Sequence, residues 1–298
     1  MDRLPAHHPF KSACAKKHYL HHYDQRAESW PVPADTMIVP TTYGKTFVRV
    51  SGPAAGPPLV LLPSTSANTL IWLPNIAALS RTYRVYAIDN IYDFGRSVYT
   101  KEITVPADLI NWLDDLFTQL ELGDSINLMG LSYGGWLTSQ YALNHPERLR
   151  KIVLLAPVAT VHQLPGEWAW RAIPALIPHR YFLRNFSNWM FTDLPLTEEG
   201  QALAEVMLED AWQGMRAFKL KMPVNPTVLS DDELTGLQVP ALFLVGENEV
   251  IYPANAALER LERVAPRIET SLIPDAGHDL TIVQADMVNQ LVLEFLKD

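Results

Sequence analysis

The stretch INLMGLSYGG, residues 126–135, decides the fold of this chain. Residues 125–129 are predicted to form a strand. A helical pattern follows at residues 133–144. Between the two lie Gly130, Ser132 and Gly134, in the spacing G-x-S-x-G, which predicts a sharp strand-to-helix turn with an exposed serine hydroxyl.

The glycine spacing has a physical reason. On so sharp a turn, side chains two positions before and after the serine would collide, so glycine is needed at both. The turn raises the hydroxyl of Ser132 above the sheet and directs the first backbone N–H groups of the helix to the same place. Ser132 is therefore the candidate nucleophile, and the N–H of Tyr133 is a candidate donor to an oxyanion.

The pattern around this turn alternates between strands and helices. Such a rhythm with short connections predicts a mostly parallel sheet with helices on both faces. Residues 158–238 break it, being helix-like, punctuated by proline and far too long for a loop. We expect an α/β core over residues 1–157 and 239–298, a helical insertion over 158–238, and an N-terminal helical arm over about 1–32 packed through Tyr19, Tyr23 and Trp30.

Composition narrows the class of function. The 298 residues carry a formal net charge of −9 and no dense basic run, which excludes a typical nucleic-acid binder. The single cysteine, Cys14, fits a reducing compartment. No apolar run is long enough to span a bilayer or to form a signal peptide, so we expect a cytoplasmic protein, monomeric or homodimeric.

A serine nucleophile needs a base, and His278 is the candidate. It follows the last predicted strand in IPDAGHDL, at the carboxyl edge of the sheet, where ligands bind in folds of this kind. The other eight histidines lie in the tail, the arm, the insertion or after a helix. The spacing of His18 and His22 suits a metal on a helix, but no carboxylate pattern accompanies it, so we expect no metal and no cofactor.

The base in turn needs an orienting carboxylate. The loop after the preceding strand reads GENEVIY, and its carboxylates are Glu247 and Glu249. Glu249 is the preferred candidate because it lies further out, where the loop turns over the sheet. Glu247 is the second choice, and Asp275, close to His278, is a weaker third.

The order Ser132, Glu249, His278 resembles that of the α/β-hydrolase superfamily. The likeness extends over nearly the whole chain after about Pro33 and is greatest to lidded serine carboxylesterases. In those enzymes a GExE loop followed by Val-Ile-Tyr, as at residues 246–252, carries a glutamate as the acid, which favours Glu249. The resemblance also implies that residues 158–238 form a lid over the site.

Two segments depart from that family pattern. The family usually has His-Gly after the third strand, and the next residue gives the second oxyanion N–H. Here Pro63-Ser64 stands in that place, so by the resemblance Thr65 should donate, with Ser64 assisting and Pro63 restricting the backbone. Residues 89–97 (DNIYDFGRS) are one residue longer than the usual turn and lack its first glycine. We interpret them as structural, at the floor of the site, with substrate contact by Asp93 or Arg96 as the lesser alternative.

The insertion is rich in large aromatic side chains. Most of them should pack the insertion onto the core, yet an apolar pocket over Ser132 would favour an acyl or aryl substrate. The candidates for substrate contact are Ser64, Trp168, Trp189 and Trp212.

These residues predict hydrolysis of a small-molecule carboxylic ester through an acyl-enzyme intermediate. The same three groups would also serve an acyltransferase, a carbon–carbon bond hydrolase or a lyase. A binding protein that keeps the pocket without turnover is the alternative outside catalysis, and the altered Pro63-Ser64 segment is the one feature in its favour.

Overall fold

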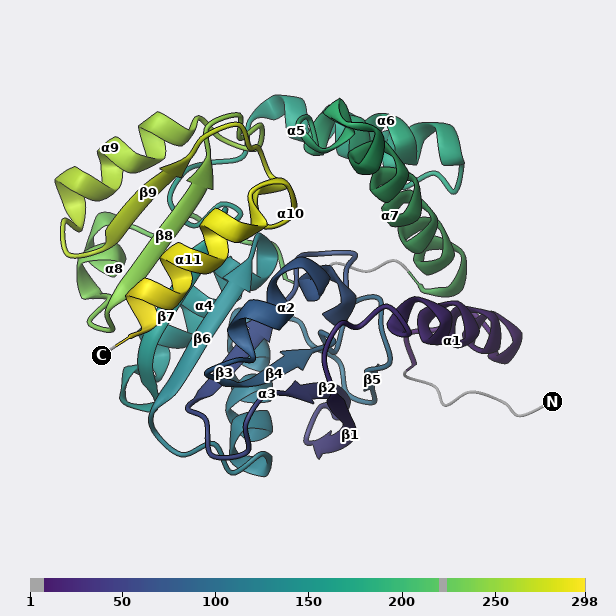
Figure 1. Cartoon of the computed structure of the whole chain (residues 1–298), viewed down its shortest axis with the longest axis horizontal. Coiled ribbons are helices and arrows are strands. Elements are labelled where there is room, and N and C mark those ends of the chain that lie inside the picture. The colour runs from purple at the N-terminus through teal and green to yellow at the C-terminus, as the bar shows by residue number, and fades with distance from the viewer. Residues whose placement is uncertain (1–7, 220–223, 298) are drawn as a thin grey trace.

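The computed structural model describes residues 8–219 and 224–297. Its centre is a nine-stranded mixed sheet in the order β1-β2-β4-β3-β6-β7-β8-β9, with β5 paired to β2 (Figure 1). The strands are β1 (Ala34–Thr41), β2 (Gly44–Ser51), β3 (Pro58–Leu62), β4 (Arg84–Ile88), β5 (Val98–Tyr99), β6 (Ile126–Leu131), β7 (Leu149–Leu155), β8 (Ala241–Gly246) and β9 (Glu269–Ile273). The predicted fold, a mostly parallel sheet between helices, is confirmed.

The sheet becomes antiparallel at one end, where β1 pairs with β2 and β2 with β4. The sequence pattern did not reveal β1. This strand lies at the sheet edge, most of its side chains are exposed, and it contains Pro40, so it lacks the apolar alternation that marks a strand. The short β5 also pairs antiparallel with β2, and the neighbours in the run β4-β3-β6-β7-β8-β9 pair in parallel.

Helices cover both faces of the sheet. One face packs against α3 (Pro106–Gln119), α4 (Tyr133–Asn144), α8 (Asp231–Gly236) and α9 (Ala254–Val264). The other packs against η1 (Thr69–Trp72), α2 (Leu73–Leu79) and α11 (Ala285–Leu296). The 3-10 turn η1 leads directly into α2. Short pieces η2 (Pro146–Arg148) and α10 (Leu280–Val283) complete the core.

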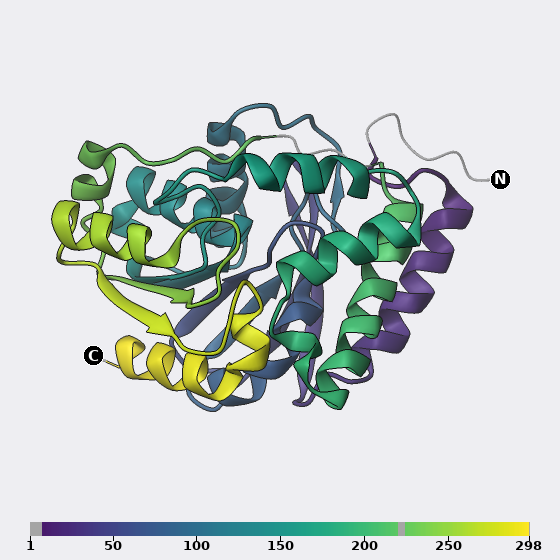
Figure 2. The same cartoon turned by 90° about the horizontal axis from the view of Figure 1, so that it is seen from above.

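Three helices lie apart from the sheet, at the upper right of Figure 1. They are α5 (Gly166–Ala175), α6 (Arg180–Met190) and α7 (Glu198–Ala217), with the 3-10 turn η3 (Leu194–Leu196) between the last two. All three lie within residues 158–238, the predicted helical insertion, and that name is kept below. In the view from above, α1 (Ala13–Ala27) runs beside α7 (Figure 2). Residues 1–7 of the predicted arm lie outside the described residues.

Side chains of the arm are buried where α1 meets the body. Tyr19 and Tyr23 are almost fully enclosed, and they pack with Phe10, Phe47 and Phe218. No helix within the described residues is long and apolar enough to cross a membrane.

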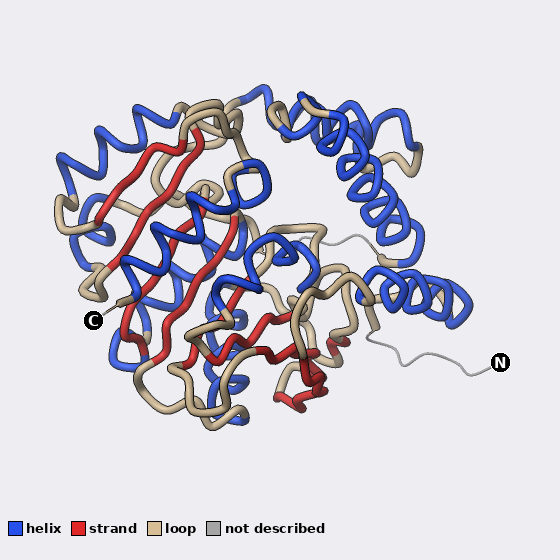
Figure 3. The backbone as a smooth tube through the Cα atoms, viewed as in Figure 1, coloured by secondary structure: helices blue, strands red, loops and turns tan. Residues whose placement is uncertain are grey.

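The loops that follow the parallel strands gather at one edge of the sheet (Figure 3). Ser132 follows β6, residues 247–253 follow β8, and residues 274–279 follow β9. The carboxyl ends of parallel strands meet at the same edge, so the fold brings the predicted nucleophile, acid and base to one side of the molecule.

Candidate active site

Ser132 occupies the turn between β6 and α4. Its backbone angles, φ 55° and ψ −113°, are outside the usual regions for a residue with a side chain. The glycines on either side have no room for a Cβ: one at Gly130 would lie 2.1 Å from the carbonyl oxygen of Gly134, and one at Gly134 would lie 2.3 Å from that of Leu62. The collision expected from the sequence is therefore confirmed.

Ser132 and Tyr133 are both held by contacts outside their own helix. The N–H of Ser132 donates to the carbonyl of Leu155 at 2.9 Å, which ties the turn to β7. The hydroxyl of Tyr133 donates to the carbonyl of Val224 at 2.8 Å, and burial, with Asp93 nearby, raises the pKa of Tyr133. Tyr133 is the first residue of α4. Its backbone N–H therefore belongs to the first helical turn, whose N–H groups have no acceptor within the helix.

His278 and Glu249 form a buried pair. Nδ1 of His278 lies 2.9 Å from Oε2 of Glu249. The other carboxylate oxygen, Oε1, accepts the N–H groups of Val250 and Ile251, so the acid has a fixed orientation. The two other carboxylates considered, Glu247 and Asp275, are exposed. The structure thus brings Glu249 to the histidine.

The carboxylates around His278 raise the pKa of its ring. Burial by itself lowers the pKa of His278, but the charge and hydrogen bond of Glu249, with the charge of Asp279, outweigh burial and raise it overall. Its Nε2 atom is buried and has no hydrogen-bond partner among the described residues. Such an atom, on a ring oriented from its other side, is equipped to exchange a proton with a neighbouring hydroxyl.

The segment after β3 runs close to the first turn of α4. The carbonyl oxygens of Leu62 and Pro63 lie against Gly134. Within this segment Ser64 is half-buried and Thr65 is exposed. Ser66 has a positive φ of 61°, and its N–H donates to Oδ1 of Asp93 at 2.8 Å. Burial raises the pKa of Asp93 to about 7.

Asp93 belongs to the loop 89–97, which the sequence led us to interpret as mainly structural. Its contact shows that this loop also fixes the backbone next to Thr65. The longer turn was the only available signal, and a turn length does not reveal a partner 27 positions away.

Asp89, at the start of the same loop, joins three parts of the molecule. It is fully buried, and its oxygens accept the N–H groups of Thr69 and Arg96 and the hydroxyl of Tyr23 from the arm. Burial raises its pKa to about 6, and these donors oppose the rise. The loop 89–97 is thus a structural support under the segment after β3.

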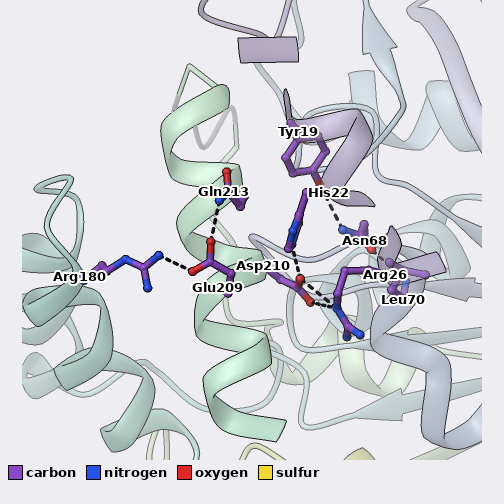
Figure 4. Close-up of polar contacts among 9 residues, drawn as sticks. All are labelled: Tyr19, His22, Arg26, Asn68, Leu70, Arg180, Glu209, Asp210 and Gln213. Atoms are coloured by element: carbon purple, nitrogen blue, oxygen red, sulfur yellow. Dashed lines mark hydrogen bonds and ion pairs between the residues drawn. The ribbon is translucent and has the colours of Figure 1, made fainter. Parts of the chain in front are cut away.

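The arm is fastened to the helical insertion by a polar cluster (Figure 4). Asp210 of α7 accepts from Arg26 Nε at 3.0 and 3.1 Å, and His22 Nε2 lies 2.6 Å from the same carboxylate. His22, one of the pair with metal-like spacing, therefore faces an aspartate of another helix. No group of three or more metal-binding side chains occurs among the described residues.

The three tryptophans considered for substrate contact lie in the insertion. Trp168 of α5 and Trp189 of α6 are half-buried and pack on the main core. Trp212 of α7 packs beside a small cluster within the insertion, formed by Leu183, Leu208 and Met215.

A mostly apolar pocket of about 110 Å³ separates α7 from the segment after β3. Ser66 and Ala67 line it directly after Thr65, and Ile282 lines it four residues after His278. Phe94 also lines it, and α7 lies so close to this ring that a Cβ at Gly214 would be 2.2 Å from it. The other lining residues are Arg26, Asn68, Leu70, Ile71, Leu73, Pro74, Leu203, Met207, Asp210 and Ala211.

Comparison with known proteins gives consistent results. Residues 59–291 match the sequence model of the alpha/beta hydrolase family. A Bacillus subtilis protein named uncharacterized carboxylesterase nap is 35% identical over 280 residues, covering 93% of this chain and 91% of its own. Carboxylesterase YbfK of the same organism is 33% identical over 279 residues, covering 92% of each chain. The crystal structure of naproxen esterase (carboxylesterase NP) from Bacillus subtilis superposes with a TM-score of 0.88, at 32% identity, and covers 96% of this chain and 100% of that one.

Proposed function

Since the chain belongs to the alpha/beta hydrolase family, we propose that it hydrolyses carboxylic esters through an acyl-enzyme on Ser132. The observation that carries this proposal is the buried Glu249–His278 pair, whose free Nε2 lies at the same sheet edge as the serine turn. Relatives at 33–35% identity that are named carboxylesterases support the same chemistry. We propose that Ser132, Glu249 and His278 act as a catalytic triad without metal or organic cofactor.

The proposed reaction has two steps. Nε2 of His278 takes the hydroxyl proton as Oγ of Ser132 bonds to the ester carbonyl carbon. The carbon–oxygen bond to the alcohol then breaks, and the leaving oxygen receives that proton, which leaves an acyl-serine. Water, deprotonated by His278, attacks the acyl carbon, and the carboxylic acid departs with Ser132 restored. Glu249 holds the ring and stabilises its charged form.

We assign the oxyanion hole to the backbone N–H groups of Tyr133 and Thr65. The first belongs to the start of α4, and the second lies in a segment held by Asp93 through Ser66. Preorganised donors of this kind stabilise the charge that develops on the carbonyl oxygen. Replacement of the usual His-Gly by Pro63-Ser64 leaves this donor set intact, because proline removes only its own N–H.

We further propose that the helical insertion acts as a lid and that the substrate carries a small to medium apolar acyl or aryl group. The mostly apolar lining of the pocket between α7 and the segment after β3 supports this polarity. Trp168, Trp189, Trp212 and Ser64 remain the proposed substrate contacts.

The first test measures p-nitrophenyl ester hydrolysis from acetate to decanoate, with Ser132→Ala as the matched variant. Turnover that disappears in Ser132→Ala, together with fluorophosphonate labelling of the parent at Ser132, would support the serine esterase. If folded parent protein is neither labelled nor active on any ester, the proposal fails and a binding protein replaces it. Labelling without ester turnover would favour an acyltransferase or a carbon–carbon bond hydrolase.

Met207→Trp tests the pocket separately. A larger side chain at this lining position should lower activity on decanoate far more than on acetate. Met287→Trp, at an exposed position of α11, is the control and should leave the chain-length profile unchanged. A profile for Met207→Trp that parallels the parent at every length would exclude this pocket from substrate binding.

We also propose a cytoplasmic location and a monomer or homodimer. Cell fractionation and light scattering on the eluted protein test these two statements.

A further inference from the structure

The connection between α6 and α7 lies against the two loops that carry the acid and the base. The N–H of Leu194 donates to Oδ2 of Asp279, the residue after His278, at 2.8 Å. Nδ2 of Asn248, the residue before Glu249, donates to Oδ1 of Asp193 at 2.9 Å. The helical insertion is therefore hydrogen-bonded to the neighbours of both His278 and Glu249.

Asp279 is the centre of this arrangement. Only 1% of its surface is exposed, and its second oxygen, Oδ1, accepts the N–H of Gly277 at 3.1 Å. The carboxylate of Asp279, the residue after His278, thus accepts a hydrogen bond from Gly277, the residue before it. Its two oxygens fix the backbone on both sides of the histidine and join that backbone to the insertion.

Gly277 allows the His278 loop to lie close to the Glu249 loop and to the connection between α6 and α7. A Cβ at this position would lie 3.0 Å from the carbonyl oxygen of Asn248 and 3.2 Å from Oγ1 of Thr192. Both distances are shorter than ordinary contacts, so a side chain here would require the neighbouring atoms to move away by a few tenths of an ångström.

We propose that Asp279 is a positioning residue of the reaction, which holds the His278 loop in its working geometry by fastening it to the helical insertion. This proposal rests on the proposed function of His278 as general base. Asp279 itself does not contact the reacting atoms. Because proton transfer requires a base within hydrogen-bond reach, a shift of the loop by about 1 Å lowers the rate even when the pair with Glu249 survives.

Charge gives Asp279 a second effect that a purely structural residue would lack. The ionisable groups facing His278 are Glu249 and Asp279, and Asp193 of the insertion faces Asp279. Burial lowers the pKa of His278, whereas Glu249 and then Asp279 raise it, with a net rise. Burial and Asp193 raise the pKa of Asp279, and the N–H groups that it binds oppose them. Loss of the Asp279 charge should therefore lower the pKa of His278.

The test is Asp279→Asn, assayed with p-nitrophenyl acetate across pH. An amide cannot accept both N–H groups as a carboxylate does, so we expect kcat to fall about tenfold with little change in KM. The acidic limb of kcat/KM should move to lower pH. Asp193→Asn is the charge-matched control: it removes a negative charge that faces Asp279 but not His278, so its acidic limb should stay at the parent's pH.

Two results would overturn the proposal: a parent-like kcat in Asp279→Asn, or a lowered kcat with an unmoved acidic limb. If Asp279→Asn does not fold, Asn248→Ala, at an exposed residue, tests the same connection. Its kcat should fall about two- to threefold at parent thermal stability, and an unchanged kcat counts against the proposal.

The failure of this proposal is distinguishable from the failure of the esterase function. The titration of the His278 ring can be followed by NMR in the parent and in Asp279→Asn without any substrate. A lower ring pKa in the variant supports the charge effect even if no ester is hydrolysed. Absence of fluorophosphonate labelling in the parent would instead remove the proposed function itself.

Discussion

The serine turn and the helical insertion meet at the same edge of the sheet, but different physical means hold them there. Ser132 is held by its backbone, which has strained φ and ψ angles, lies between two glycines without room for a Cβ, and donates a hydrogen bond to β7. The insertion is held by side chains at a few points and leaves Trp170, Ile173, Leu176, Ile177 and Tyr181 of its outer surface exposed. Single changes should therefore cost much more at the sheet edge than in the insertion.

Glu249→Gln should show the largest effect. Oε1 accepts two backbone N–H groups, so the new amide nitrogen would face Nδ1 of His278 and force that atom to accept. The proton then stays on Nε2, and the ring cannot act as a base. We expect kcat to fall by about 10³- to 10⁴-fold with the fold intact. Glu247→Gln, two residues away and exposed, is the control; equal losses in both variants would refute the role of Glu249.

Gly134→Ala at the serine turn and Gly166→Ala in the insertion together compare backbone crowding in the two regions. Its Cβ would lie 2.3 Å from the carbonyl oxygen of Leu62, so the segment carrying Thr65 must move away from Ser132. We expect about a 100-fold loss of kcat. The matched change in the insertion, Gly166→Ala, meets nothing within 4 Å and should retain full activity. Steady-state kinetics and thermal melts measure both; an active Gly134→Ala would contradict the tight turn.

The pH dependence should reflect the sheet edge and not the arm. The pKa of His278 is raised from its ordinary value of 6.5, and the neutral ring is the active base. The ring is therefore protonated and inactive below a midpoint that lies above 6.5, and kcat/KM should fall about tenfold per pH unit there. A midpoint below 6.5 would mean that burial outweighs the carboxylates. Asp210→Asn, in the insertion, should keep the parent's midpoint.

The same contrast explains how far the sequence could predict the structure. Gly130, Ser132 and Gly134 act through their own backbone, so their spacing is sufficient to predict the turn. Glu249 and His278 follow strands whose order brings them to one edge, and the strand pattern is local. These features are readable from short segments.

The contacts of the insertion join residues far apart in the chain, so no short segment of sequence carries a pattern that predicts them. Asp210 meets the arm 184 and 188 positions away, and Leu194 meets Asp279 85 positions away. Asp93 looks like any loop aspartate until Ser66 is placed beside it. Polar residues that act through one distant partner carry no periodicity, so a single sequence cannot identify them.

Of the substitutions compared between the serine turn and the insertion, Asp210→Asn should have the smallest effect on activity. The amide keeps one acceptor oxygen but loses the charge that Arg26 and His22 share (Figure 4). These side chains are partly exposed, so the loss should be about 1 kcal/mol in the free energy of unfolding, with kcat close to the parent's. The control is Glu205→Gln, which removes an exposed ion pair with Arg184 inside the insertion and should cost less than about 0.5 kcal/mol. Denaturant unfolding measures both, and a loss of several kcal/mol in Asp210→Asn would show that side-chain contacts hold the insertion as firmly as backbone holds the serine turn.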